Sequence, residues 1–73
     1  MDAEIIEFEI RKENRVTHHT LGELKLPDAS IVAGVIRQDQ SIIPGGDFQL
    51  QKGDKVIVFS LPEAIKKVEK LFK

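Results

Sequence analysis

The spacing of apolar and polar residues changes along this chain, and each change predicts an element of secondary structure. In residues 3–10, apolar side chains at every second position alternate with acidic ones, which is typical of a half-buried strand. Ile5 interrupts this alternation, so we expect its side chain to face a second layer or a partner. The polar residues 11–15 are expected to form a loop. The alternating apolar positions are Ile6, Phe8 and Ile10.

Two nearly unbroken apolar runs predict two further strands. Residues 31–36 and 56–59 are rich in β-branched and aromatic residues, which favour strands. We place these strands at residues 30–37 and 55–60. Because residues 56–59 have no polar face, we expect the second of these strands to be central and covered on both sides.

Polar residues, Pro and Gly predict the connections between these strands. Residues 38–40 form a tight polar connection, so residues 41–43 should return antiparallel as a short strand. Pro44 ends this strand because proline cannot donate a hydrogen bond to the ladder. Residues 48–50 are then a brief extended piece before a turn at Gly53.

A short helical turn is predicted between the first two strands. Thr20 and Glu23 have the spacing of a capping box, in which a hydroxyl and a carboxylate satisfy the free amides at a helix start. Pro27 closes the segment, because the residue before a proline avoids the helical region. We therefore expect one helical turn at residues 20–25.

A second helix is predicted at the end of the sequence, over residues 62–73. Ser60 and Glu63 repeat the capping-box spacing, and Pro62 falls in the first turn, where its missing N–H does no harm. Apolar residues recur at helical intervals, so this helix should lie on the sheet. These apolar positions are Ile65, Val68, Leu71 and Phe72.

The order of these elements predicts an α+β fold. We expect a small, mostly antiparallel (mixed) sheet of about four strands, with the short helix and the C-terminal helix on one face. Residues 1–73 make a single domain, which we expect to be excised from a larger protein. A chain of 73 residues has a marginal core, and without cysteine no disulfide can compensate, so we also expect a homodimer.

Composition excludes several classes of function. The charge is nearly balanced, with 11 basic and 12 acidic residues, and Trp and Tyr are absent. Neither a basic stripe nor a platform for stacking bases is visible, so we expect no nucleic-acid partner. The N-terminus is acidic, without the apolar core of a signal peptide, and no apolar stretch approaches a membrane span. The chain is therefore expected to be cytoplasmic and not inserted in a membrane.

His18 and His19 are the only histidines. Adjacent residues of an extended segment point to opposite sides, so the pair chelates one metal poorly, and we expect no metal site. Two interpretations stay open. The histidines belong to a solvated loop, or one imidazole contacts an anionic ligand or a partner chain.

Glycines near the third strand have plain structural interpretations. Gly45 and Gly46 are followed by neither Lys-Ser/Thr nor a helix start, so we interpret them as a turn and not a phosphate loop. Gly34, inside a strand, indicates close approach by another backbone or a ligand. The alternative, which we favour, is that a helix packs tightly over Gly34.

Arg37 and Asp54 are charged residues close to the ends of the apolar strands: Arg37 ends one, and Asp54 follows Gly53 shortly before the other. Arg37 either clamps a carboxylate or phosphate, or caps its hairpin by pairing with Asp39 or Asp47. Asp54, after Gly53, should accept hydrogen bonds from the turn amides. Neither a catalytic triad nor a carboxylate pair in an apolar setting is visible, so we expect no enzyme.

Several of these residues, in their order and spacing, resemble the C-terminal regulatory (RCK-C, or TrkA-C) domain of TrkA/KtrA-type potassium uptake regulators. The resemblance covers nearly the whole chain. It is carried by Thr20-Leu21, Glu23-Leu24, Leu26-Pro27, Ile31-Val32-Ala33, Ile36-Arg37, Pro44, Leu50, Gly53-Asp54, Val56 and Val58. The structural part of this motif comprises Arg37, Pro44, Gly53 and Asp54.

The resemblance implies a cytosolic domain that follows a nucleotide-binding Rossmann domain and regulates a potassium transporter or channel. Such domains typically dimerise, and in some members cyclic di-AMP binds at the dimer interface. Cation/proton antiporters carry the same domain. The Gly-rich loop of a Rossmann domain is absent from this sequence, so neither NAD nor ATP binding is carried over, and no cofactor is expected in this domain.

The chain departs from the family pattern at one position. Many members have Gly-Lys shortly before the helix-starting Leu, and here that pair falls on His18-His19. If this member binds a ligand, the resemblance places it in a region that includes the histidines. The residues around that region are Ile10, Arg11, Asn14, His18, His19 and Pro27.

The sequence thus predicts a regulatory ligand-binding and dimerisation domain of a potassium or other cation transport system, with a transporter or channel subunit as partner. Cyclic di-AMP is the candidate ligand. The alternative is a purely structural assembly module without a small-molecule ligand.

Overall fold

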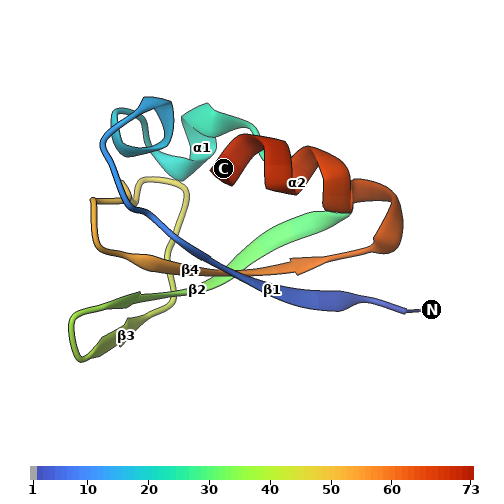
Figure 1. Ribbon diagram of the computed structural model, residues 1–73, viewed down its shortest axis with the longest axis horizontal. Coiled ribbons are helices and arrows are strands. Elements are labelled where there is room, and N and C mark those ends of the chain that lie inside the picture. The colour runs from blue at the N-terminus through green and yellow to red at the C-terminus, as the bar shows by residue number, and fades with distance from the viewer. Residues whose placement is uncertain (1) are drawn as a thin grey trace.

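The computed structural model describes residues 2–73, which form one four-stranded sheet with helices on one face (Figure 1). The strands are β1 (Glu4–Glu9), β2 (Ser30–Arg37), β3 (Gln40–Ile42) and β4 (Lys55–Ser60). The helices are α1 (Leu21–Leu24) and α2 (Ile65–Phe72), preceded by the 3₁₀ turns η1 (Arg15–Thr17) and η2 (Pro62–Ala64). The strand order is β1-β4-β2-β3, and every pairing among the described residues is antiparallel. The predicted α+β class is confirmed, although β3 lies one residue earlier than expected.

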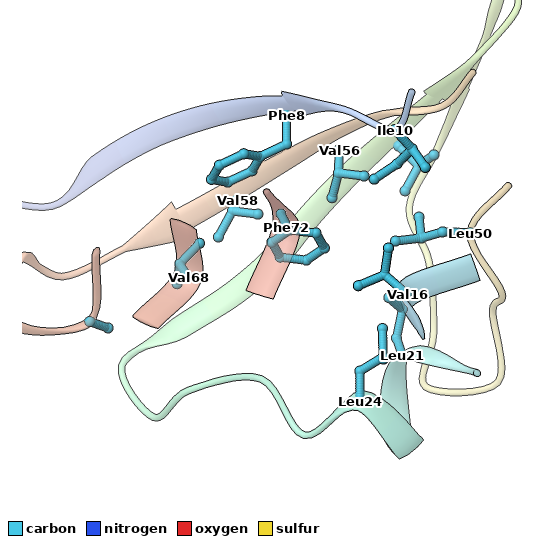
Figure 2. Close-up of a cluster of buried hydrophobic side chains, with 12 residues drawn as sticks. Phe8, Ile10, Val16, Leu21, Leu24, Leu50, Val56, Val58, Val68 and Phe72 are labelled. Carbon is cyan, nitrogen blue, oxygen red and sulfur yellow. The ribbon is translucent and has the colours of Figure 1, made fainter. Parts of the chain in front are cut away.

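The core lies between the sheet and the helices (Figure 2). The register places Val58 of β4 opposite Ile6 of β1 on one side and Val32 of β2 on the other. Because side chains alternate between the two faces of a strand, these residues share the inner face, and Val58 is fully buried. Val16 of η1 and Leu50 of the loop before β4 also belong to this core.

The predicted apolar stripe of α2 covers the sheet. Val68 and Phe72 are buried, and the Phe72 ring stacks on Phe8 of β1 with centroids 5.1 Å apart and an interplanar angle of 24° (Figure 2). Ile65 and Leu71, at the sides of the stripe, are half-buried. The helix therefore lies on the inner face with its lysines outward.

The predicted capping box at Ser60 and Glu63 is wrong. The segment begins as the 3₁₀ turn η2, whose N-cap is Leu61, and no side chain of the described residues caps it. The Ser60 hydroxyl is buried in β4 and donates to the Leu61 carbonyl at 2.9 Å. Since Ser60 is the last residue of the strand, its hydroxyl does not reach the helix amides.

The capping box of α1 is confirmed, and the sequence contains a second one that the prediction missed. Thr20 Oγ1 accepts from the Glu23 amide at 3.2 Å, and Glu23 Oε1 accepts from the Thr20 amide at 2.7 Å. This amide hydrogen bond lowers the pKa of Glu23. At η1, Asn14 Oδ1 accepts from the Val16 amide and Thr17 Oγ1 accepts from the Asn14 amide. The signal was an Asn three residues before a Thr, which is an N-cap spacing.

Strand β4 is central, as predicted, but it is not covered on both faces. Val56, Val58 and Ser60 point toward the helices and are buried, whereas Phe59 on the outer face is 41% exposed. In Figure 1, α1 and α2 both lie on the same side of the sheet. The two short helices cover only one face of the sheet. An unbroken apolar run in a strand therefore does not show that both of its faces are covered.

The expectation that a helix packs over Gly34 is also wrong. A Cβ atom built on Gly34 would meet only the Ile42 carbonyl oxygen of the neighbouring strand, at 3.6 Å. The pairing of β2 with β4 shifts between Val32 and Gly34, which marks a β-bulge. Gly34 therefore serves the bulge, where an unpaired residue bends the strand.

Candidate functional site

Arg37 and Asp54 form a doubly hydrogen-bonded ion pair. Arg37 Nε donates to Asp54 Oδ1 at 2.9 Å and Arg37 Nη2 donates to Oδ2 at 2.8 Å, so the guanidinium binds the carboxylate with both nitrogens. Of the two alternatives left open for Arg37, the pairing with Asp39 or Asp47 is wrong. The strand register explains why Arg37 pairs with Asp54. Ile36 lies opposite Lys55, so the end of β2 is adjacent to the start of β4.

The loop before β4 closes around this pair. Asp54 Oδ2 also accepts from the Gln51 amide at 2.8 Å, which confirms the expected bond to a turn amide. Arg37 Nη2 donates to the Gln49 carbonyl at 3.1 Å, and its guanidinium lies 4.8 Å from the centre of the Phe48 ring. The guanidinium thus ties β2, β4 and the loop between them into one unit.

This environment shifts the pKa of both partners. The hydrogen bonds that the Arg37 guanidinium donates to the Asp54 carboxylate raise the pKa of Arg37. For Asp54, burial alone would raise the pKa, but the hydrogen bonds from Arg37 and from the Gln51 amide outweigh burial and hold the pKa below its usual range. The side chain of Asp54 is 1% exposed and that of Arg37 is 26% exposed. The pair is therefore an ionised clamp with a buried carboxylate and a partly exposed guanidinium.

The glycine turn after Pro44 joins the loop to α1. The Gly46 carbonyl accepts from the Gly22 amide at 2.9 Å, and a Cβ on Gly22 would come within 3.1 Å of that oxygen. The predicted turn is confirmed, and it holds the helix against the loop. Gly53 has φ of 97°, a value that favours glycine, and its amide donates to the Ile10 carbonyl at 2.7 Å.

A groove lies between the end of β1 and the end of α2. Its volume is ≈ 540 Å³. Phe8, Ile10 and Phe72 form its apolar wall, while cationic and acidic side chains form the rim. Arg11 at the rim is highly exposed and lies 3.6 Å from Glu9. The lining residues are Glu7, Phe8, Glu9, Ile10, Arg11, Lys12, Asn14, Phe72 and Lys73.

The six predicted ligand residues do not share one cavity within a single chain. Ile10, Arg11 and Asn14 line the groove just described. Pro27 lies in a different hollow, beside the lysines of α2. His18 is exposed, with Nε2 3.8 Å from Glu13 Oε1, and neither histidine lines the groove. One chain therefore presents the predicted residues as separate surface features.

Residues 2–73 contain no group of three or more His, Cys, Asp and Glu side chains placed to hold a metal ion. Within the same residues, no helix combines the length and the apolar character that crossing a membrane requires.

The one-sided antiparallel sheet with its C-terminal helix defines a small RCK-type domain. A solved structure described as "Structure of RCK domain with cda" superposes with a TM-score of 0.78 at 25% identity, covering 94% of this chain and 97% of the other. Residues 5–73 match the family model of the TrkA-C domain. The chain belongs to the TrkA-C domain family, as its sequence predicted.

Relatives with the same domain occur in archaea. Residues of "Trk system potassium uptake protein TrkA homolog 2" of Methanosarcina mazei are 42% identical over 71 residues, which is 97% of this chain and 16% of that protein. A TrkA homolog of Pyrococcus abyssi is 34% identical over 70 residues, 94% of this chain and 31% of that protein. This chain thus spans less than a third of the length of these relatives.

Proposed function

We propose that this TrkA-C domain is a cytosolic regulatory domain of a potassium or other cation transport system, which dimerises and binds a nucleotide second messenger. Cyclic di-AMP is the first candidate ligand. The role is regulatory and not catalytic, and its partner is a membrane transporter or channel subunit. The observation that carries the ligand proposal is the groove beside Ile10, found in a chain whose relatives are named as potassium uptake proteins.

The groove has the chemistry that a cyclic dinucleotide requires. Its volume, ≈ 540 Å³, lies in the range of small-molecule sites. Arg11, Lys12 and Lys73 supply cations for phosphate oxygens, and Phe8 and Phe72, each 6% exposed, contribute a small apolar surface at the base of the groove. Glu7 and Glu9 would repel an anion, but Arg11 lies 3.6 Å from Glu9 and offsets the charge of that carboxylate. A related RCK domain is described "with cda", which is consistent with this ligand class.

Dimerisation would reconcile the separated ligand residues. Pro27 and the histidines lie outside the groove that contains Ile10 and Arg11. A ligand bound between two copies can contact one feature from each copy, which is how a site at an interface differs from a pocket in one chain. The dimer is therefore part of the same proposal.

The test is a thermal-shift series of the chain with cyclic di-AMP, cyclic di-GMP, ATP, ADP and NADH. A ligand at 100 times its dissociation constant stabilises by about 2.7 kcal/mol. For a domain of this size that corresponds to a Tm increase of roughly 10–20 °C. We expect this increase with cyclic di-AMP and not with the other nucleotides.

Variants locate the site. Arg11→Ala should reduce the cyclic di-AMP shift, because it removes a cation from the rim of the groove, and the pair His18→Ala with His19→Ala should reduce it if the histidines contact the ligand. Lys66→Ala is the matched control, since it removes one exposed cation that does not line the groove. Absence of a shift with every nucleotide would favour the alternative, a structural assembly module.

A further inference from the structure

A hollow with a cationic rim lies between the end of α1 and the exposed side of α2, which are side by side in Figure 1. Its volume is ≈ 460 Å³. Leu24, Pro27 and Leu71 give the hollow an apolar base, and all its other lining residues carry a positive charge. We call this feature the cationic hollow. Its cations are Arg15, Lys25, Lys67 and Lys70.

None of these cations forms an ion pair within residues 2–73. The neighbouring carboxylates do not line the hollow. Glu69 of α2 instead lies 3.7 Å from Lys73, and Glu23 of α1 accepts from the Thr20 amide. Asp28 is also outside the lining. Although the whole chain has a net charge of −1, the hollow therefore presents exposed cations to a partner.

The backbone at Lys25 indicates a role for its charge. Lys25 follows α1 with φ of 52° and ψ of 73°, in the left-handed region. Glycine takes this conformation at a helix end without steric cost, whereas a side chain makes it less favourable. Because α1 has only four residues, its small dipole explains little of the preference for a cation there. The chain thus has a lysine at a position where glycine would fit the backbone better.

The lysines of α2 have a second explanation, because the dipole of a helix favours cations near its C-terminal end. That explanation does not extend to Arg15 of η1 or to Lys25, which lie outside α2. Three separate segments therefore bring cations to one hollow, where like charges repel one another. A bound anion would relieve this repulsion.

The shape and chemistry of the cationic hollow favour a peptide segment rich in carboxylates. Its cations line a concave surface, so a flat anionic membrane would not reach all of them, whereas a narrow chain would. Among the described residues, none that lines it is aromatic, so single-stranded nucleic acid would find no stacking surface there. The apolar base can receive an aliphatic side chain, as pockets receive alternate side chains of extended peptides.

We propose that the cationic hollow binds an acidic segment of a partner protein, with Glu or Asp carboxylates on its cations and an aliphatic side chain on its base. This inference goes beyond the proposed function, because the hollow shares no lining residue with the groove beside Ile10 and needs no nucleotide. Exposed charge pairs each contribute modestly, so the binding is reversible and weakens as salt is added.

The experiment is fluorescence anisotropy of a labelled pentapeptide, Glu-Glu-Leu-Glu-Glu, titrated with the chain at low ionic strength. The same peptide with Gln in place of Glu is the control for charge. Lys25→Gly and Lys70→Gln each remove one cation from the hollow. Lys66→Gln is the matched control, because it removes an exposed cation of α2 that does not line the hollow.

We expect Lys25→Gly and Lys70→Gln each to raise the dissociation constant of the peptide by about 2- to 5-fold, the loss of one exposed ion pair. Lys66→Gln should bind as the original chain does. Thermal denaturation should show that Lys25→Gly is at least as stable as the original chain, since glycine suits that backbone, so weaker binding would not reflect unfolding. Equal binding by all the variants, or equal binding of the Gln peptide, would overturn the proposal.

Competitors test the other occupants of the hollow. Displacement of the peptide by cyclic di-AMP would assign the hollow to the nucleotide, and displacement by phosphatidylserine vesicles would assign it to a membrane. Either result would overturn this inference and leave the regulatory role in place. Peptide binding that neither competitor changes would support it, whatever the nucleotide thermal shifts show.

Discussion

The two faces of the sheet are built from similar residues but have different environments. On β4, Val56 and Val58 point to the helices and are fully buried, while Phe59 points the other way and is 41% exposed. The inner face is completed by α2 and by loop residues such as Leu50. The comparison teaches that in a small domain an apolar strand indicates two usable faces, of which the chain covers only one. The other is available for a partner.

Removing one aromatic ring from each face of the sheet should produce the largest difference in the free energy of unfolding. Phe72→Ala deletes a buried ring that stacks on Phe8, and we expect a loss of about 3–5 kcal/mol in the free energy of unfolding. Phe59→Ala deletes a ring that is 41% exposed and should cost clearly less. Urea denaturation of both variants, at a concentration where the chain is monomeric, measures the difference. Equal losses would contradict the one-sided core.

The Arg37–Asp54 clamp should have the next largest effect. Asp54→Asn keeps the shape of the side chain but leaves the guanidinium of Arg37 without its counter-charge. The Asp54 side chain is only 1% exposed, so water cannot replace this charge. We expect a loss of about 2–3 kcal/mol, since hydrogen bonds to charged groups are among the stronger ones. Urea denaturation measures it. Asp39→Asn is the matched control and should change stability little, because Arg37 does not pair with Asp39.

The same clamp predicts a pH dependence. The pKa of Asp54 is lower in the folded chain than in the unfolded chain. The clamp therefore contributes its full stability above the unfolded value of about 3.9, and loses it as the pH falls from there through the folded pKa. Thermal denaturation between pH 7 and pH 2 should show a steeper acid loss for the original chain than for Asp54→Asn. Parallel curves would mean that Asp54 does not titrate as proposed.

We expect the smallest loss of stability at the helix caps, where the two sequences with capping-box spacing should differ. Thr20→Ala removes a hydroxyl that accepts from the Glu23 amide, and we expect a loss of about 1 kcal/mol. Ser60→Ala removes a hydroxyl that bonds only to the neighbouring Leu61 carbonyl, so the helix start should not weaken. Chemical denaturation and amide exchange at the first turn of each helix distinguish them. A larger loss for Ser60→Ala would contradict the observed caps.

The sequence singled out many residues of the candidate site, but it did not predict which of them lie together. The importance of Arg37 was visible from its place at the end of an apolar strand, yet its partner is Asp54, 17 residues away, and not the nearer Asp39 or Asp47. Likewise Ile10, Arg11 and Asn14 meet in one groove, while Pro27 lies in another. Sequence proximity suggests pairs within a hairpin, whereas strand register decides which ends meet.

Local pattern was sufficient for the secondary structure, the α+β class, the cap of α1 and the family. Each of these depends on residues within a few positions of one another, or on their order along the chain, and the alternation in β1 and the helical spacing in α2 are both of this kind. Only the tertiary structure decided that the apolar run of β4 has one covered face, that Gly34 lies at a bulge, and that the Ser60 hydroxyl bonds the Leu61 carbonyl and does not cap the helix. The physical reason is that coverage, register and the direction of a side chain at a strand end depend on contacts between segments far apart in sequence.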